Sequence, residues 1–303
     1  STPCEHSFPT RRSSDLSGTG MSTLKIKEEF IMIINHNMSA MNANRNVNIN
    51  STAASKSMQK LSSGLRINNA ADDAAGLAIS EKMRGQIRGL DQGSKNAQDG
   101  ISLIQTAEGA LNETTSILQR MRELSVQSAT ATNTSADRTA ISTEFTQMKD
   151  EITRIGTQTE FNTKALIGGA FSTATLDFQI GANADQKISL NIKNMTSSGL
   201  VLTGASVGTT TNSQLATALL DTALASVSNE RANLGSVQNR LEHTINNLNT
   251  SSENLQTSES RIRDVDMAKE MSEFSKNNIL SQAAQAMLSQ ANQQPQQILQ
   301  LLR

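Results

Sequence analysis

Residues 220–262 read LDTALASVSNERANLGSVQNRLEHTINNLNTSSENLQTSESRI, and this stretch decides the fold. Alternating steps of four and three residues from its first leucine define a seam in which nine of thirteen positions are apolar and none is proline or glycine. The seam consists of Leu220, Leu224, Val227, Arg231, Leu234, Gln238, Leu241, Ile245, Leu248, Ser252, Leu255, Glu259 and Ile262. A heptad pattern kept over this length predicts one long helix that lies along another helix. Because such a helix is not stable alone in water, a second segment must cover its apolar face.

The composition favours a thin helical protein over one with a large globular core. The chain has 303 residues, of which 36% are apolar and 2% aromatic, and it lacks tryptophan and tyrosine. A formal net charge of −1 predicts no surface for nucleic acid or for an anionic membrane. No apolar run reaches the roughly 18 residues of a membrane span, and no signal-peptide core is visible. The single cysteine, Cys4, excludes a disulfide framework within the chain and a cysteine metal cluster.

Residues 1–31 differ in character from the rest of the chain. Ser1–Gly20 shows no periodicity and contains the cysteine. Residues 27–29 read KEE, whose codons are purine-rich like a bacterial ribosome-binding site, and Met32 follows after two residues. We therefore interpret Met32 as the native start and 1–31 as a non-native leader that would impair function; the alternative is a genuine disordered arm. The intact mass of the native protein distinguishes the two.

Two segments before residue 130 have helical patterns. Ile33–Leu65 carries a weak apolar stripe among many asparagines and serines, so we expect it to fold only against a partner. Ala74–Ser128 is a second long rod, capped by Asp72 or Asp73, and it is the natural antiparallel partner of 220–262. Its glycines at 85, 89, 93, 100 and 109 are expected to permit the close approach of another helix.

The pattern changes in the second half. Asp137–Gly156 predicts a third helix, and Leu176–Ile180 with Lys187–Ile192 predicts a β-hairpin. Met195–Asn212, rich in serine, threonine and glycine, is expected to be an exposed loop. A final helix begins near Met267 and is expected to be interrupted at Pro295. The predicted fold is mainly α, with long antiparallel coiled-coil-like helices, a small β-hairpin region and paired terminal helices.

No group of residues predicts catalysis or metal binding. His36 and His243 lack the spacing of metal ligands, so surface or interface positions are favoured. Asp72-Asp73 followed by Glu81 could suggest carboxylate catalysis, but the surrounding alanines favour a helix cap or turn. Neither a phosphate-binding loop nor a nucleophile–histidine–acid order is present. We expect no enzyme activity and no cofactor.

Four stretches resemble bacterial flagellin. They are MIINHNMSAMNANRN from Met32, LSSGLRINNAADDAAGLAISEKMRGQIRGL at 61–90, LQRMRELSVQSA at 118–129 and SRIRDVDMAKEMSEFSKNNILSQAAQAMLSQANQQPQQILQLLR at 260–303. With the helices between them, the resemblance covers nearly all of 32–303. It identifies the chain as a short flagellin without the outer variable domains.

The resemblance implies a structural subunit that polymerises into the extracellular flagellar filament for motility. It implies that 32–66 and 264–303 form paired terminal helices in the filament core. It further implies that 67–160 and 213–263 form a long-helix shaft, and that 161–212 form the β-hairpin and a variable loop. A contact between copies that does not close on itself generates such an open polymer. Export would use the flagellar type III apparatus, without a cleaved signal peptide.

The resemblance also implies partners other than the chain itself. An export chaperone, or packing in the filament core, would use an apolar face formed by Met271, Phe274, Leu280, Met287, Ile298, Leu301 and Leu302. A host Toll-like innate-immune receptor would contact Arg120, Leu124, Gln127 and Glu144, although the same face could pack against the next subunit. The end Leu301-Leu302-Arg303 resembles the segment that cytosolic immune receptors sense. Hook-associated and cap proteins complete the implied partners; nucleic acid and membrane insertion are not implied.

Two alternatives remain. A hook-associated junction or cap protein would share the terminal helices, but the short insert at 161–212 disfavours it. Some family members carry a protease insertion in the variable region, but Met195–Asn212 contains no histidine or glutamate. A filament subunit would be present in thousands of copies, which separates it from a junction or cap protein.

Overall fold

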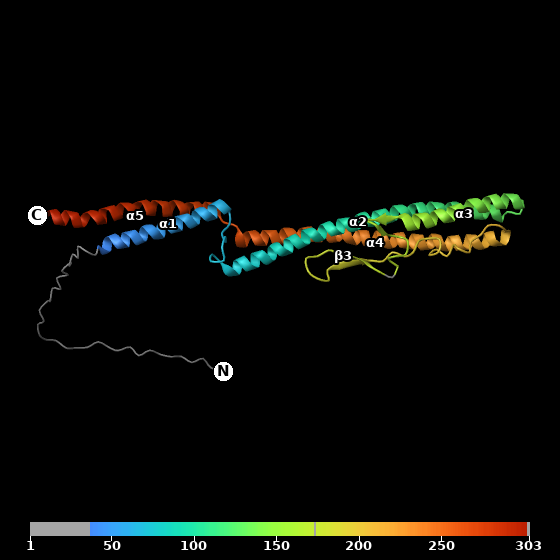
Figure 1. Ribbon diagram of the computed structural model, residues 1–303, viewed down its shortest axis with the longest axis horizontal. Coiled ribbons are helices and arrows are strands. Elements are labelled where there is room, and N and C mark those ends of the chain that lie inside the picture. The colour runs from blue at the N-terminus through green and yellow to red at the C-terminus, as the bar shows by residue number, and fades with distance from the viewer. Residues whose placement is uncertain (1–36, 173, 302–303) are drawn as a thin grey trace, which may run out of the picture. The chain divides into compact units, whose positions relative to one another are not determined.

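The two longest helices, α2 (Ala74–Ala129) and α4 (Thr210–Arg263), lie side by side and antiparallel in the computed structural model (Figure 1). The structure describes residues 37–172 and 174–301, without the side chains of 298–301. The predicted leader, 1–31, lies outside this range. Ion pairs join opposite ends of the two helices: Arg122 lies 2.7 Å from Asp221, and Arg263 lies 2.7 Å from Glu81. The antiparallel pairing predicted from the heptad seam is therefore confirmed.

The residues of the predicted seam of α4 are all buried or half-buried, but the most deeply buried stripe does not coincide with every seam position. Leu220, Leu234 and Leu241 are fully buried, as predicted. After each of Leu220, Val227 and Leu234, however, the most deeply buried residue is three positions further along the chain. The heptad seam predicted the residue four positions further along. The structure buries Ala223, Glu230 and Val237 most deeply, whereas Leu224, Arg231 and Gln238 are half-buried and Leu224 packs against the core from its edge. Both positions lie beside the seam on a helix, so the pattern alone cannot choose between them.

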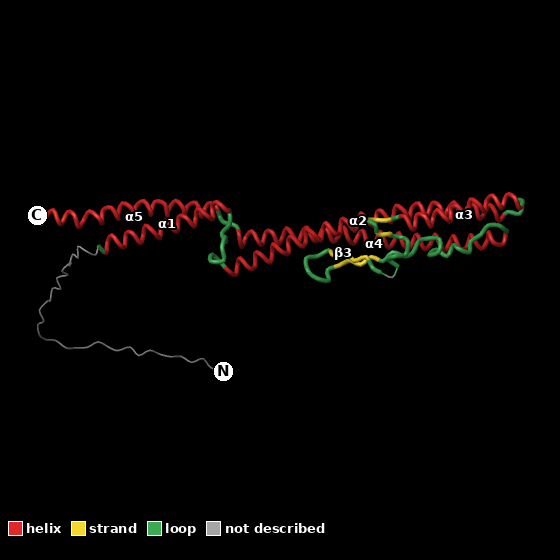
Figure 2. The backbone as a smooth tube through the Cα atoms, in the orientation of Figure 1, coloured by secondary structure: helices red, strands yellow, loops and turns green. Residues whose placement is uncertain are grey.

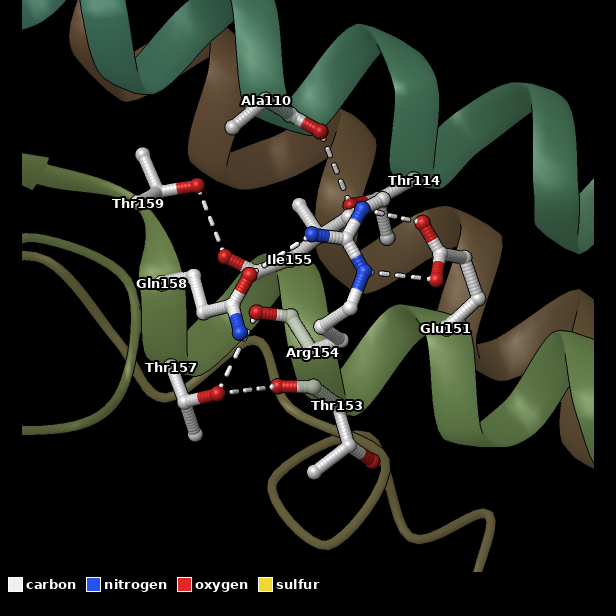
Figure 3. Close-up of polar contacts among 9 residues, drawn as sticks. All are labelled: Ala110, Thr114, Glu151, Thr153, Arg154, Ile155, Thr157, Gln158 and Thr159. Carbon is white, nitrogen blue, oxygen red and sulfur yellow. Dashed lines mark hydrogen bonds and ion pairs between the residues drawn. The ribbon is translucent and has the colours of Figure 1, made fainter.

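Helix α3 (Ser135–Gln158) packs on α2 and is held by polar contacts at both of its ends. Thr134 and Asp137 form a capping box at its start. Figure 3 shows the other end, where the Thr159 hydroxyl donates to the Ile155 carbonyl at 2.7 Å. There Arg154 also bonds Glu151 and Gln158 along the helix surface. The third predicted helix is confirmed and is longer than expected.

Four short strands follow α3 and form two antiparallel pairs (Figure 2). Strands β1 (Glu160–Phe161) and β2 (Lys164–Ala165) make a small pair that the sequence did not predict. Strands β3 (Leu176–Gln179) and β4 (Lys187–Leu190) make the predicted hairpin.

The hairpin region packs on α2 over three of its glycines. A Cβ at Gly93 would lie 2.5 Å from the Ile180 carbonyl oxygen, and one at Gly89 would lie 2.6 Å from the Ala182 side chain. At Gly100 the neighbours are Phe178 and Leu241. The missing side chains at these three glycines therefore allow close packing on α2. The neighbour that packs there is chiefly the hairpin region and not another helix, which corrects the prediction.

The segment after β4 corrects the prediction of an exposed loop. Met195, Leu202 and Val207 are buried in the same core as α2 and α4. Two buried hydroxyl groups of α2 also fix the end of this segment and the start of α4. Ser128 donates to the Val207 carbonyl, and Ser125 donates to the Ser213 carbonyl at 2.7 Å. A composition rich in serine and threonine predicted exposure, but the few apolar residues among them anchor the loop.

The described chain divides into two compact units, one of residues up to 53 with 276 onward and one of 54–275. Helices α1 (Met38–Ser63) and α5 (Met267–Leu301) each begin in one unit and end in the other. In the first unit the two helices run beside each other (Figure 1). The mainly α fold with long antiparallel helices, a small hairpin and paired terminal helices is thus confirmed.

Helix α5 continues through Pro295, so the predicted interruption is wrong. Proline has no N–H to donate to the carbonyl four residues earlier, here that of Ala291. Asn37, directly before α1, donates its side-chain N–H to this carbonyl at 2.7 Å. The same side chain accepts the Ala40 N–H at 3.0 Å. Asn37 thus caps α1 and replaces the hydrogen bond that Pro295 removes from α5.

Candidate functional site

Helices α1 and α5 leave many large apolar side chains exposed to solvent. Residues of this kind, each between 41% and 66% exposed, are Met38, Met41, Ile49, Met58, Met267, Met271, Ile279, Leu280 and Met287. In α1 the buried residue is a serine, Ser57. Single exposed apolar residues are common on folded proteins, but so many on two helices indicate an interaction site. These two helices are therefore the candidate assembly surface.

The exposed residues of α5 do not form one stripe. Met271 and Leu280 are nine positions apart and so lie on opposite sides of an α-helix. Met287 shares the side of Leu280, whereas the half-buried Phe274 lies near Met271. Of the predicted docking face, the side chains of Ile298, Leu301 and Leu302 lie outside the described range. A helix with apolar residues on opposite sides needs neighbours on more than one side.

Of the predicted receptor-binding face, the structure brings Arg120 of α2 and Glu144 of α3 into contact. The Arg120 guanidinium donates to the Glu144 carboxylate from Nε at 3.1 Å and from Nη2 at 3.0 Å. It also bonds Glu123 one turn along α2, and these hydrogen bonds, with Glu123 first and Glu144 second, raise the pKa of Arg120. Gln127 is exposed on the same helix. This leaves a polar surface around an exposed ion pair.

Leu124 lies below this surface. Its side chain is 1% exposed and belongs to the core that α2 forms with α4. It is one helical turn from Arg120, as the spacing requires, but it lies on the side of α2 that turns toward the core. In this structure Leu124 can support the position of Arg120 and Gln127, and it is not available for direct contact.

The structure adds two charged residues to this surface that the sequence reading missed. Arg122 bonds Asp221 of α4 at 2.7 Å, and Glu123 shares Arg120 with Glu144. Arg122, Glu123 and Gln127 line a shallow groove on α2. The Arg120–Glu123 spacing of three residues was a signal for one of these contacts. The Arg122–Asp221 pair depends on the register of two distant helices, which the sequence did not fix.

Asp72 and Asp73, the acidic pair considered as possible catalytic residues, both hold the local backbone in place. Asp73 caps α2 by accepting the Gly76 N–H at 2.8 Å, as predicted. Asp72 accepts the backbone N–H groups of Asn69 and Asn68, and these hydrogen bonds lower the pKa of its carboxyl group.

His243 is exposed on α4, and His36 lies outside the described range. Among the residues that the structure describes, no cluster of three histidine, cysteine or acidic residues could hold a metal ion. Within the same residues, no helix has the length and apolar character needed to cross a membrane.

Two family models match two long segments of the chain. A family model for the bacterial flagellin N-terminal helical region matches residues 34–172, and the model for the C-terminal helical region matches 217–302. The unmatched middle contains β3, β4 and the anchored loop. The matched segments include the exposed faces of α1 and α5.

Similar proteins match over most of the chain. A flagellin of Halalkalibacterium halodurans is 60% identical and a flagellin of Bacillus subtilis is 57% identical; each alignment covers 90% of this chain and 100% of the relative. A solved Vibrio parahaemolyticus structure, assigned as flagellar hook-associated, covers 64% of this chain and all of its own, with a TM-score of 0.55 and 12% identity. At that identity the likeness shows the fold alone. The chain belongs to the bacterial flagellin family.

Proposed function

We propose that the chain is the repeating subunit of the bacterial flagellar filament and that α1 and α5 make the contacts between copies. Membership of a family of structural proteins supports a subunit and not an enzyme. The proposed filament core comprises residues 32–66 and 264–303, and the proposed shaft comprises 67–160 and 213–263. Residues 161–212, with β3, β4 and the anchored loop, complete the subunit.

The observation that carries this proposal is the contrast between shaft and terminal helices. In the shaft, leucines such as Leu111, Leu118 and Leu241 are fully buried within one copy. In the terminal helices, Ile279 and Met287 are about two-thirds exposed. Since α5 is apolar on opposite sides, neighbours from several copies are needed to cover it. Subunits that repeat such a contact without closing a ring form a helical fibre.

Seeded polymerisation tests the proposal. The purified chain, both from Ser1 and from Met32, is mixed with short filament fragments, and growth is followed by sedimentation and negative-stain electron microscopy. We expect long filaments above a critical concentration and free subunits below it. Subunits that remain monomeric at every concentration, with seeds shown to be active on a known flagellin, would contradict the proposal.

We further propose that a cytoplasmic export chaperone covers α5 before assembly, and that export proceeds without a cleaved signal peptide. The side of α5 that carries Leu280 and Met287 is the better candidate, since both residues are exposed and share it. Lysine at both positions should abolish the chaperone complex in size-exclusion chromatography. Lysine at Met271, on the opposite side, is the matched control and should retain it.

We also propose that a host Toll-like receptor contacts the exposed polar surface of Arg120, Gln127 and Glu144. The support is the ion pair of Arg120 with Glu144 and the exposure of Gln127 on the same helix as Arg120, with Leu124 in the core beneath. Alanine at Arg120 or Glu144 should weaken receptor activation in reporter cells without loss of helix content. Alanine at Arg154, which forms a similar exposed pair with Glu151 on α3, is a control that should leave activation unchanged.

Contacts with hook-associated and cap proteins at the two ends of the filament are proposed through the same terminal helices. A role as a junction or cap protein is not favoured by any feature of the chain. Its 60% identical relative is a flagellin along its whole length. At 12% identity, the likeness to the hook-associated structure concerns the fold alone.

A further inference from the structure

The methionines of this protein are divided between the core of the shaft and the surface of the terminal helices. The chain has 12 methionines, of which Met21 and Met32 lie outside the described range. Met121 and Met195 are buried, and Met83 and Met148 are half-buried. Six exposed residues, named here the terminal-helix methionines, are Met38, Met41 and Met58 on α1 and Met267, Met271 and Met287 on α5.

Exposure governs how fast a methionine reacts with peroxide. The thioether sulfur attacks one oxygen of hydrogen peroxide, an S–O bond forms and the O–O bond breaks. The other oxygen leaves as hydroxide and takes the proton from the sulfur-bound oxygen, giving water and methionine sulfoxide. Sulfur loses two electrons and the peroxide gains them. Because no base or metal from the protein takes part, access of the oxidant to sulfur is the main requirement.

We propose that the terminal-helix methionines are sites of reversible oxidation by peroxide, and that their oxidation prevents a free subunit from joining a filament. The proposal rests on the proposed function, in which α1 and α5 become covered by other copies. A sulfoxide is polar, and burying it without a hydrogen-bond donor is unfavourable. Methionine sulfoxide reductases remove the oxygen, so the subunit can be restored. In the folded subunit, the same change cannot readily reach the buried Met121 and Met195.

The location of these residues makes the effect specific to assembly. Each of the six side chains is between 49% and 65% exposed, so sulfoxide oxygens remain in water while the subunit is free. The folded shaft keeps its core, and the oxidised chain should stay helical. The unfavourable burial arises only when another copy covers α1 or α5. Incorporated subunits should be protected, because their methionines are no longer exposed.

Oxidation and assembly can be measured separately on the full chain. The free subunit is treated with hydrogen peroxide, catalase stops the reaction, and a thiol reductant reverses sulfenic acid at the single cysteine. Peptide mass spectrometry then follows oxygen gain at each methionine, and seeded sedimentation gives the critical concentration. We expect the terminal-helix methionines to react at least tenfold faster than Met121 and Met195. We expect the critical concentration to rise at least tenfold and to return after treatment with both sulfoxide reductases.

A sixfold methionine-to-leucine variant provides the decisive comparison. Leucine keeps the volume, apolarity and helix propensity of methionine. This variant should assemble before and after peroxide, with Met21 and Met32 still present. The matched control replaces Met83, Met121, Met148 and Met195 by leucine and should remain sensitive. Two threefold variants, one in α1 and one in α5, should each be partly resistant, which covers the case that the sixfold variant assembles poorly.

Two results would overturn the proposal. One is an unchanged critical concentration after all six methionines carry an oxygen. The other is a sixfold or threefold variant as sensitive to peroxide as the natural sequence. Failure of the untreated natural chain to grow on seeds would instead contradict the proposed filament function. Selective oxidation measured by mass spectrometry does not depend on filament growth, so the two failures are distinguishable.

Discussion

Val201 combines a branched side chain with a left-handed backbone, at φ 57°. It is 66% exposed, so packing does not explain the choice of valine. β-Branched residues are strained in this region, whereas asparagine tolerates it. We predict that Val201→Asn raises the free energy of unfolding by about 1 kcal/mol, measured by urea denaturation. Val126→Asn, at an exposed position within α2, is the control and should give no gain.

Glu230 is a buried acid in the contact face of α4, only 3% exposed. Burial raises the pKa of its carboxyl group, although the Lys193 backbone N–H, 3.3 Å away, and the Lys193 charge oppose this. The folded protein therefore holds this proton to higher pH than the unfolded chain does. The free energy of unfolding should fall as pH rises from the unfolded value of about 4.3 through the raised value.

Glu230→Gln should remove this pH-dependent loss. The amide oxygen of glutamine can still accept the Lys193 N–H, while no charge is buried at neutral pH. We predict greater stability than the natural sequence at pH 7 and little difference at pH 3, measured as thermal midpoints across that range. Glu253→Gln, at an exposed position of the same helix, should show no such gain. Equal pH profiles for the two variants would contradict this account.

At the scale of elements, the glycines of α2 have two different roles. Gly93 gives space to the Ile180 carbonyl, where a Cβ would lie at 2.5 Å, whereas a Cβ at Gly85 or Gly109 would have no atom within 4 Å apart from the local backbone of α2. We predict that Gly93→Ala destabilises the protein by about 1–3 kcal/mol, because the hairpin region must move. Gly85→Ala and Gly109→Ala are matched controls and should stabilise it by about 0.5–1 kcal/mol. Urea denaturation checks all three, and equal effects would contradict the assignment.

Asn37 and Pro295 couple the start of α1 to α5. In Asn37→Asp the side chain can still accept the Ala40 N–H but can no longer donate to the Ala291 carbonyl. We predict that this loss lowers the stability of the α1–α5 contact by about 1 kcal/mol. Hydrogen exchange should then be roughly fivefold faster in the first turns of α1. Pro295→Ala restores an N–H for Ala291, so Asn37→Asp should have a smaller effect in that background. Additive effects of the two substitutions would contradict the coupling.

Some features of these elements could be predicted from the sequence, and others could not. Helix positions, the antiparallel pairing and the hairpin followed from periodicity, because apolar spacing of 3.5 or 2 residues reflects local geometry. The deeper burial of Ala223 than of Leu224, and the anchoring of Val207, depend on neighbours far along the chain. Continuation of α5 through Pro295 depends on a donor 258 positions away, at Asn37. Helical spacing put Arg120 and Gln127 on one side of α2, whereas the burial of Leu124 depends on the pairing of α2 with α4.

At the scale of the molecule, the shaft is complete within one copy and the terminal helices are not. The 54–275 unit contains a continuous core that joins α2, α3, α4 and the hairpin. The exposed apolar residues of α1 and α5 have no comparable cover within the described chain. Folding and assembly should therefore respond to different substitutions.

Ile49 of α1 tests this separation. It is 57% exposed, so Ile49→Lys should change the free energy of unfolding of the free subunit by no more than about 0.5 kcal/mol and leave its helix content unchanged. In a filament the lysine would be buried or would repel copies of itself, and the critical concentration should rise at least tenfold, or about 1.4 kcal/mol. Leu215→Lys changes an equally exposed residue of α4, outside the proposed core, and should have a clearly smaller effect. Seeded sedimentation and circular dichroism measure both variants. If both raise the critical concentration equally, α1 has no special role in the contacts between copies; if neither does, its apolar face lies outside them.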